Sequence, residues 1–270
     1  MMDFSLIADN LENSDGVWQS KHKRAISYPE SGNQDCFQLE ENSFWFAHRN
    51  KCITELVKHF APDKYLFDIG GGNGFVSLSL ERAGLNTVLV EPGVQGVANA
   101  KKRGLKNLIC SSLEDASFHP ASMDAVGLFD VIEHINDDMT FLKNTYELVS
   151  NNGMVFITVP AYQFLWSGAD ILAGHYRRYT LKSLAQVLAK AGFEVKYKTY
   201  FFSLLPIPIF LFRSIPDKFR KIEEGRAEGL KEDHKKSKFS KLFEWELKQV
   251  RNLRTIPFGG SCLVVASKRV

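Results

Sequence analysis

Short apolar runs and longer amphipathic stretches follow one another along most of this 270-residue chain. A short apolar run bounded by Gly, Pro or acidic residues predicts a buried strand, and apolar positions at helical spacing predict a helix. We expect strands over residues 65–69, 87–90, 107–110, 125–129, 154–159, 193–200 and 262–266. We expect helices over residues 41–60, 75–83, 94–103, 138–149 and 181–191.

This alternation predicts the fold class. Strands that alternate with helices of this length form βαβ units and a largely parallel sheet with helices on both faces. We therefore expect an α/β, doubly wound, seven-stranded, mostly parallel sheet within residues 61–270. Residues 1–60 are expected to form an irregular polar extension, with a turn signal at Asp15-Gly16, followed by a helical cap. A lid inserted at 203–257 is expected before the last strand.

The predicted insertion begins with the apolar segment 201–212 (FFSLLPIPIFLF). A membrane-crossing helix needs about 20 apolar residues, so this segment does not cross a bilayer by itself. Two interpretations stay open. Residues 201–221, which end in basic side chains, could contact an anionic membrane surface, or the segment could be a lid over the active site or a homodimer contact. The mixed-charge run that ends at Lys241 is expected to be a solvated helix or a mobile segment.

Composition narrows the protein class. Hydrophobic residues make up 44% of the chain, which is typical of a globular protein, and the net charge of +3 is too small to predict a nucleic-acid partner. The four cysteines, Cys36, Cys52, Cys110 and Cys262, have neither zinc-site spacing nor a disulfide pattern. We therefore expect a cytoplasmic protein without a metal site, and no secretory signal is visible at the start.

A glycine-rich turn follows the first predicted strand of the sheet and precedes a predicted helix, at 68–74 (DIGGGNG). In an open parallel sheet, ligands bind beyond the carboxyl ends of the strands, and glycines let the backbone approach them closely. A dinucleotide site has the spacing G-x-G-x-x-G, which would place a third small residue at Phe75. The spacing here is G-x-G-x-G, so the dinucleotide interpretation is the weaker one.

The next predicted strand ends at Glu91, seventeen residues after Gly74. A carboxylate at this position can accept hydrogen bonds from both hydroxyls of a ribose. Each residue alone has a simpler explanation, Gly74 as a tight turn and Glu91 as a surface acid before Pro92. The combination of strand, acid, glycines, helix, strand and acid favours a nucleoside-containing cofactor.

Four stretches resemble the class I S-adenosylmethionine-dependent methyltransferases: FDIGGGNG at 67–74, LVEP at 89–92, SSLEDASF at 111–118 and LFDVIEHI at 128–135. The resemblance implies a Rossmann-like fold and S-adenosyl-L-methionine as the cofactor. It places the first stretch at the methionine part of the cofactor, the second at the ribose, the third at the adenine, and the fourth along the transfer cavity. The implied cofactor residues are Asp68, Gly70, Gly71, Gly72, Gly74, Glu91, Pro92, Leu113, Glu114, Asp130 and Val131.

The segment after the fourth predicted sheet strand faces the same crevice. Methyl transfer depends on alignment of a nucleophile with the sulfonium carbon, and a base is needed only where the acceptor loses a proton. His134 is a candidate general base because its ordinary pKa lies near neutrality. The alternative is that Glu133 and His134 hydrogen-bond a neighbouring loop or cap the next helix, and the two interpretations weigh equally.

Two further runs resemble a subgroup of the same methyltransferases: GHYRRYT at 174–180 and FWFAHRN at 44–50. Members of that subgroup are often encoded near glycan or lipid-linked saccharide enzymes. Guanidinium groups pair with carboxylates or phosphates, which suits an anionic or hydroxyl-rich substrate; the alternative is an arginine clasp that binds backbone carbonyls. The candidates are His175 and Tyr179 for catalysis, Arg178 and Tyr162 for the substrate, Arg49 for the cofactor carboxylate, and Thr180 as a helix N-cap.

The sequence therefore predicts an S-adenosylmethionine-dependent methyltransferase that acts on a small-molecule or lipid- or glycan-linked acceptor. An NAD(P)-dependent oxidoreductase on a similar sheet is the enzyme alternative. A catalytically silent S-adenosylmethionine-binding protein is the non-enzyme alternative.

Overall fold

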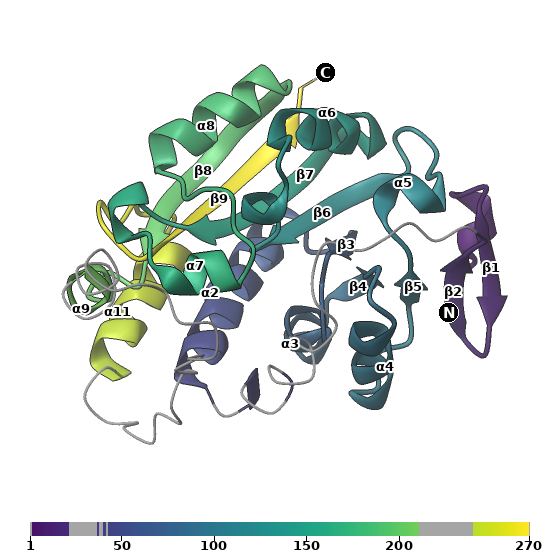
Figure 1. Cartoon of the computed structure of the whole chain (residues 1–270), viewed down its shortest axis with the longest axis horizontal. Helices are drawn as coiled ribbons and strands as arrows, with labels where there is room; N and C mark the ends of the chain where they lie inside the picture. Colours follow the sequence, from purple (N-terminus) through teal and green to yellow (C-terminus); the bar gives the residue numbers. More distant parts are fainter. Residues whose placement is uncertain (1, 22–36, 38–39, 42, 211–239, 270) are drawn as a thin grey trace.

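The computed structural model describes residues 2–21, 37, 40–41, 43–210 and 240–269. In these residues one nine-stranded sheet has the order β1-β2-β5-β4-β3-β6-β7-β9-β8 (Figure 1). The strands are β1 Leu11–Ser14, β2 Val17–Ser20, β3 Tyr65–Ile69, β4 Asn86–Val90, β5 Leu108–Cys110, β6 Met123–Phe129, β7 Val149–Pro160, β8 Phe193–Phe201 and β9 Ser261–Lys268. Strands β5, β4, β3, β6 and β7 are parallel, and β9 runs antiparallel between β7 and β8.

The strand order reverses at β3, which pairs with β4 on one side and with β6 on the other. All residues of β3 after Tyr65 are buried, as expected of a strand covered on both faces. Crevices beyond the carboxyl ends of the strands at such a switch point are where α/β folds bind ligands. The predicted site segments after β3, β4 and β6 all leave the sheet at this end.

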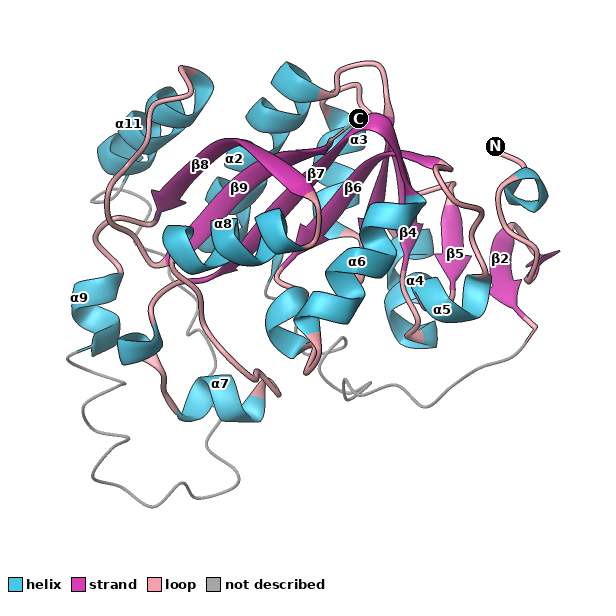
Figure 2. Cartoon of the chain, turned by 90° about the horizontal axis from the view of Figure 1, so that it is seen from above, coloured by secondary structure: helices cyan, strands magenta, loops and turns pink. Residues whose placement is uncertain are grey.

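Helices cover both faces of the sheet (Figure 2). One face packs against α5 Leu113–Ala116, α6 Asp138–Leu148 and α8 Leu181–Lys190. The other packs against α2 Phe44–Phe60, α3 Phe75–Arg82, α4 Val94–Lys102 and α11 Ser240–Arg251. The remaining helical segments are η1 Phe4–Leu6, η2 Ile132–His134, η3 Gln163–Leu165, α7 Gly168–Leu172 and α9 Pro206–Ile209. Thr180 is the N-cap of α8, as predicted, and its side chain accepts a hydrogen bond from the Ser183 N–H.

The expectations of seven strands and of an irregular N-terminal extension were wrong. Residues 11–20 form the hairpin β1–β2, and β2 adds to the sheet edge in parallel with β5. Asp15 and Gly16 both have positive φ, as a two-residue turn of the hairpin type requires. The hairpin was not predicted because only Leu11 of β1 is buried and the other three residues of that strand are exposed, so no apolar run marks it.

Helix α11, in the described part of the insertion at 203–257, flanks the cap helix α2. Helix α11 packs along α2, where His48 contacts Glu246 at 2.8 Å and Phe44 stacks on Phe243. The Glu246 carboxylate also accepts hydrogen bonds from the N–H groups of Phe202 and Ser203. Most of the predicted mixed-charge run and the basic side chains after 212 lie outside the described residues. Within the described part, no helix has the length and apolar character needed to cross a membrane.

Candidate functional site

The glycine loop after β3 has a backbone that only glycine adopts readily. Gly70, Gly72 and Gly74 have positive φ, and Gly74 is the N-cap of α3. At Gly71 a Cβ atom would lie 2.3 Å from Leu89 Cδ1, and at Gly74 it would lie 2.5 Å from Leu105 Cδ1. Gly70, Gly71 and Gly72 therefore leave part of the loop backbone exposed, while other positions of the loop pack against β4 and the end of α4.

Glu91, at the end of β4, lies beside this loop. Its Oε2 accepts a hydrogen bond from the Gly72 N–H at 2.9 Å, and its Oε1 accepts one from the Gly93 N–H at 2.7 Å. Burial raises the pKa of Glu91, and the two N–H groups oppose that rise by stabilising the charge. Each carboxylate oxygen retains a second acceptor direction, so the group can also receive two hydroxyls.

Asp68 lies at the base of the loop and is completely buried. Its Oδ2 accepts a hydrogen bond from the Ser77 hydroxyl at 2.7 Å, while Oδ1 has no partner among the described residues. Burial raises the pKa of Asp68 to about 6, although the Ser77 hydrogen bond and the Arg49 charge both lower it. Asp68 thus braces the first turn of α3 on the glycine loop.

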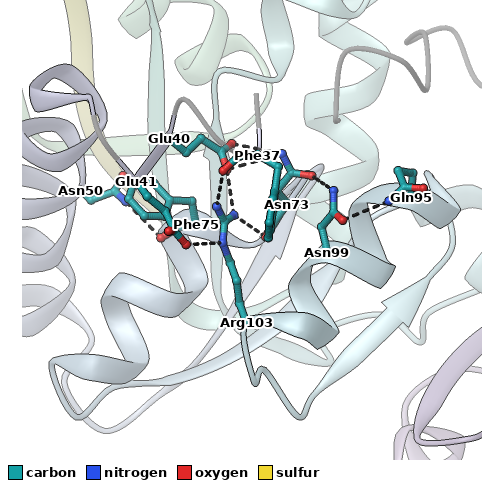
Figure 3. A network of polar contacts seen from close by, with 9 residues as sticks. All are labelled: Phe37, Glu40, Glu41, Asn50, Asn73, Phe75, Gln95, Asn99 and Arg103. Atoms are coloured by element: carbon teal, nitrogen blue, oxygen red, sulfur yellow. Dashed lines mark hydrogen bonds and ion pairs between the residues drawn. The ribbon is translucent and has the colours of Figure 1, made fainter. Parts of the chain in front are cut away.

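A polar network that the sequence analysis missed holds the loop from outside (Figure 3). Arg103, at the end of α4, donates to the Asn73 carbonyl at 2.7 Å and to Glu40 at 2.8 Å. The Asn99 side chain donates to Asn73 Oδ1 at 2.9 Å. The Arg103 guanidinium also lies over the ring of Phe75, at 5.1 Å from its centroid. No local motif announces this network because its members come from three separate segments.

The remaining predicted cofactor residues surround the same end of the sheet. Leu113 is buried at the start of α5, whereas Glu114 beside it is exposed. Pro92 is half-buried and its carbonyl lies 3.8 Å from Cys110 Sγ. The third stretch therefore offers the crevice one apolar and one acidic side chain.

Asp130 follows β6 and reaches back to the cap helix. It has positive φ, a conformation that side-chain-bearing residues seldom adopt and that clusters at functional sites. Its carboxylate pairs with Arg49 and accepts a hydrogen bond from the Thr158 hydroxyl at 3.1 Å. Val131 next to it borders Gly70, where a Cβ atom would lie 3.1 Å from Val131 Cγ2. The structure thus joins Arg49, Asp130, Val131 and the glycine loop.

The next turn of the chain, η2, brings Glu133 and His134 against His175. Glu133 is completely buried, and neither of its carboxylate oxygens has a hydrogen-bond partner among the described residues. Burial and the nearby Asp130 charge raise the pKa of Glu133 well above its ordinary value. The rings of His134 and His175 meet edge to face with centroids 4.6 Å apart. Burial and the neighbouring His175 lower the pKa of His134 to about 4.

Asp170 in α7 organises the loop that carries His175 and Arg178. It accepts hydrogen bonds from the His175 ring at 2.9 Å and, through both oxygens, from Arg178 at 2.8 and 2.9 Å. Burial acts to raise the pKa of Asp170, but the hydrogen bonds from His175 and Arg178 lower it to about 2. Arg178 also donates to the Ala161 carbonyl at 3.2 Å. This geometry matches the arginine-clasp interpretation of the arginine run.

The side chains of Tyr179 and Tyr162 also make hydrogen bonds or ring contacts with other residues. Tyr179 is 4% exposed and donates its hydroxyl proton to Asp138 at 2.6 Å. Burial, reinforced by that hydrogen bond, raises the pKa of Tyr179 far above its ordinary range. Tyr162 has positive φ and its ring stacks on Tyr200 and against Phe258. Tyr179 is thus buried with its hydroxyl bound to Asp138, while the Tyr162 ring lies among aromatic side chains.

Asp170 is the main site residue that the sequence analysis missed. The spacing Ser167-x-x-Asp170 is that of a capping box, and the structure contains this capping box at α7. That signal marks a helix start, but it does not announce that the same carboxylate will bind His175 and Arg178. Asp170 therefore links two predicted residues that the sequence treats as separate.

Comparisons with known proteins agree on one kind of domain. A family model described as a methyltransferase domain matches residues 44–198, more than half of the chain. A probable S-adenosylmethionine-dependent methyltransferase of Mycolicibacterium smegmatis is 23% identical over 171 residues, 62% of this chain and 66% of that protein. The ubiquinone biosynthesis O-methyltransferase of Parvibaculum lavamentivorans is 27% identical over 161 residues, 53% of this chain and 63% of that protein. The chain thus spans less than two thirds of the length of these relatives.

The fold has counterparts among solved structures. A S-adenosylmethionine-dependent methyltransferase of Thermotoga maritima, described as a possible histamine N-methyltransferase, superposes with a TM-score of 0.56 at 18% identity. The superposition covers 89% of this chain and all of that chain. This similarity concerns the fold, an α/β sheet of the Rossmann-like kind.

Proposed function

The chain belongs to the methyltransferase domain family, and on that premise we propose that it transfers a methyl group from S-adenosylmethionine to a small-molecule or lipid- or glycan-linked acceptor. The cofactor of the family is S-adenosylmethionine. The kind of acceptor and the atom that receives the methyl group are what we propose.

One observation carries the proposal: Glu91 and the open backbone of the glycine loop lie together at the switch point of the sheet. A carboxylate held by two backbone N–H groups is fixed in position and ready to accept two ribose hydroxyls. The exposed end of the loop admits the methionine part of the cofactor. Asp130 and Val131 then border the region where the methyl group would lie.

Arg49 is a candidate for the cofactor carboxylate. Its guanidinium pairs with Asp130, and its Nε is buried without a partner among the described residues. An unsatisfied buried donor on a charged group costs free energy unless a ligand supplies an acceptor. A carboxylate placed there would meet that requirement.

The dinucleotide alternative fits less well. A dinucleotide site needs a small residue at position 75, so that a pyrophosphate reaches the helix N-terminus. Phe75 instead packs its ring on Phe46 and under Arg103. The position is thereby filled by side chains that join α2, α3 and α4.

The acceptor is proposed to have an apolar part and an oxygen nucleophile. Phe164, Leu204, Ile207 and Phe258 expose between 38% and 56% of their surface on the segments that follow β7 and β8 and precede β9. The name of the Parvibaculum lavamentivorans relative, which denotes transfer to oxygen, supports the nucleophile. A membrane contact or a homodimer contact through residues 201–221 remains part of this proposal.

Two measurements test the proposed function. Calorimetry should show binding of S-adenosylmethionine and S-adenosylhomocysteine, with no heat from NADH or NADPH. Incubation with methyl-labelled cofactor and extracted lipid and saccharide pools should then transfer label to one pool. Tight binding of a dinucleotide without S-adenosylmethionine would overturn the proposal, and cofactor binding without transfer to any pool would favour the silent binding protein.

A further inference from the structure

The cluster of Glu133, His134 and His175 has the composition of a metal site. Each of these three described residues offers one potential ligand atom, a carboxylate oxygen or a ring nitrogen, and the three atoms lie within 4.8 Å of one another. Ligands about 2.1 Å from one ion are separated by about 3.4 Å, so small rotations of the three side chains bring them into coordination distance. Two imidazoles and one carboxylate are ligands that divalent transition metals accept.

The state of Glu133 points independently to a missing partner. It is completely buried, yet both carboxylate oxygens lack a hydrogen-bond donor among the described residues. A buried carboxylate in this condition is costly unless it is protonated or meets a cation. His134 and His175 stand beside it and are only partly buried, so an ion can reach the cluster from the solvent side.

His175 is oriented as a metal-ligating histidine would be. Its Nδ1 contacts Asp170 at 2.9 Å, and Arg178 holds Asp170 through both oxygens. Metal-bound histidines almost always donate their other ring N–H to a carboxylate or carbonyl, which leaves the opposite nitrogen with a lone pair. The Tyr176 N–H donates to the Glu133 carbonyl at 2.8 Å and fixes the loop against η2. The GHYRRYT run thus has a physical role as the support of His175.

We propose that Glu133, His134 and His175 bind one divalent transition-metal ion, with Asp170 as the positioning residue of His175. This proposal departs from the expectation of a protein without a metal site, which was based on cysteine spacing; the fold assembles this cluster from segments about 40 residues apart.

A role for the ion in catalysis rests on the proposed function. Three protein ligands leave coordination positions open, and a metal lowers the pKa of a hydroxyl bound there. The acceptor O–H would lose its proton to solvent water, and its oxygen would attack the methyl carbon. The O–C bond forms as the C–S bond breaks, and the sulfonium leaves as the neutral thioether of S-adenosylhomocysteine. The acceptor class is accordingly a hydroxyl compound.

The test measures metal binding directly on the full chain. After chelator treatment and dialysis, calorimetry with Zn²⁺, Mn²⁺ and Mg²⁺ should give one site that prefers Zn²⁺ or Mn²⁺, because Mg²⁺ favours all-oxygen sites. Co²⁺ added to the wild-type protein should produce visible absorption bands whose intensity reports nitrogen and oxygen ligands. This spectrum needs no variant, so it is informative even if a variant fails to fold.

Variants assign the ligands. Glu133→Ala and His175→Ala should weaken binding about 100-fold, and Asp170→Asn about 10-fold. The matched control is His119→Ala, since His119 also contacts a carboxylate, Asp9 at 2.8 Å, but on the exposed surface. Absence of metal binding by the wild-type protein, or binding that survives Glu133→Ala and His175→Ala, would overturn the inference. S-adenosylmethionine binding measured on the same samples separates this failure from a failure of the proposed function.

Discussion

The two halves of the crevice are built in different ways. The cofactor half, residues 65–110, is built largely from backbone: glycines at positive φ and a carboxylate that accepts hydrogen bonds from two backbone N–H groups. The acceptor half, residues 128–180, is made of side chains, several of which meet across about 40 residues of sequence, such as His134 with His175 and Tyr179 with Asp138. A backbone-built site leaves a local motif in the sequence, whereas a side-chain-built site does not.

The largest expected effect is a loss of stability when the Asp170–Arg178 pair of the acceptor half is broken. Asp170→Ala leaves the Arg178 guanidinium without its bidentate partner, and both side chains are at least 90% buried. Loss of one partner of a buried pair should lower the free energy of unfolding by about 3–5 kcal/mol in urea denaturation. Glu55→Ala, which breaks the exposed bidentate pair with Arg251, should cost about 0.5 kcal/mol. Equal losses would show that the Asp170 clasp is no stronger than a surface pair.

The next effect concerns pH in the cofactor half. The pKa of Asp68 is raised to about 6 from an ordinary 3.8, so the folded state binds the proton more tightly than the unfolded chain does. The contribution of Asp68 to stability is therefore greatest below about pH 4, falls as pH rises to about 6, and is constant above that. The total change is about 3 kcal/mol. When the unfolding free energy is measured from pH 4 to 7, Asp68→Asn should no longer show this fall. If the variant and the wild type had the same pH profile, Asp68 would not be the cause of the fall.

A third variant sharpens the assignment of the ribose site. Glu91→Ala removes two charge-assisted acceptors for ribose hydroxyls, so the Kd for S-adenosylmethionine should rise about 100-fold in calorimetry. Glu147→Ala, an exposed glutamate on α6, is the control and should leave Kd unchanged. A similar Kd for Glu91→Ala and wild type would place the ribose elsewhere.

The smallest effect separates packing from catalysis at Tyr179. Tyr179→Phe removes one hydrogen bond to Asp138 and keeps the buried ring. The unfolding free energy should fall by about 1 kcal/mol and kcat should change less than about twofold. A loss of about 100-fold or more in kcat would instead support a catalytic role for Tyr179.

The contrast also explains what the sequence could predict. The strand–glycine–helix unit, the acid after β4 and the N-cap Thr180 are local patterns, and the structure contains each of them. The hairpin β1–β2 was missed because its strands are polar and short. Asp170 was missed because its partners lie in a later loop, and the network around Arg103 was missed because three segments supply it.

A structure of the chain with S-adenosylhomocysteine tests the central claim most directly. The account predicts both ribose hydroxyls within hydrogen-bond distance of Glu91, the amino-acid part over the glycine loop, and the sulfur facing the segment from Asp130 to His134. Nucleoside density away from Glu91, or a sulfur directed away from that segment, would contradict the account.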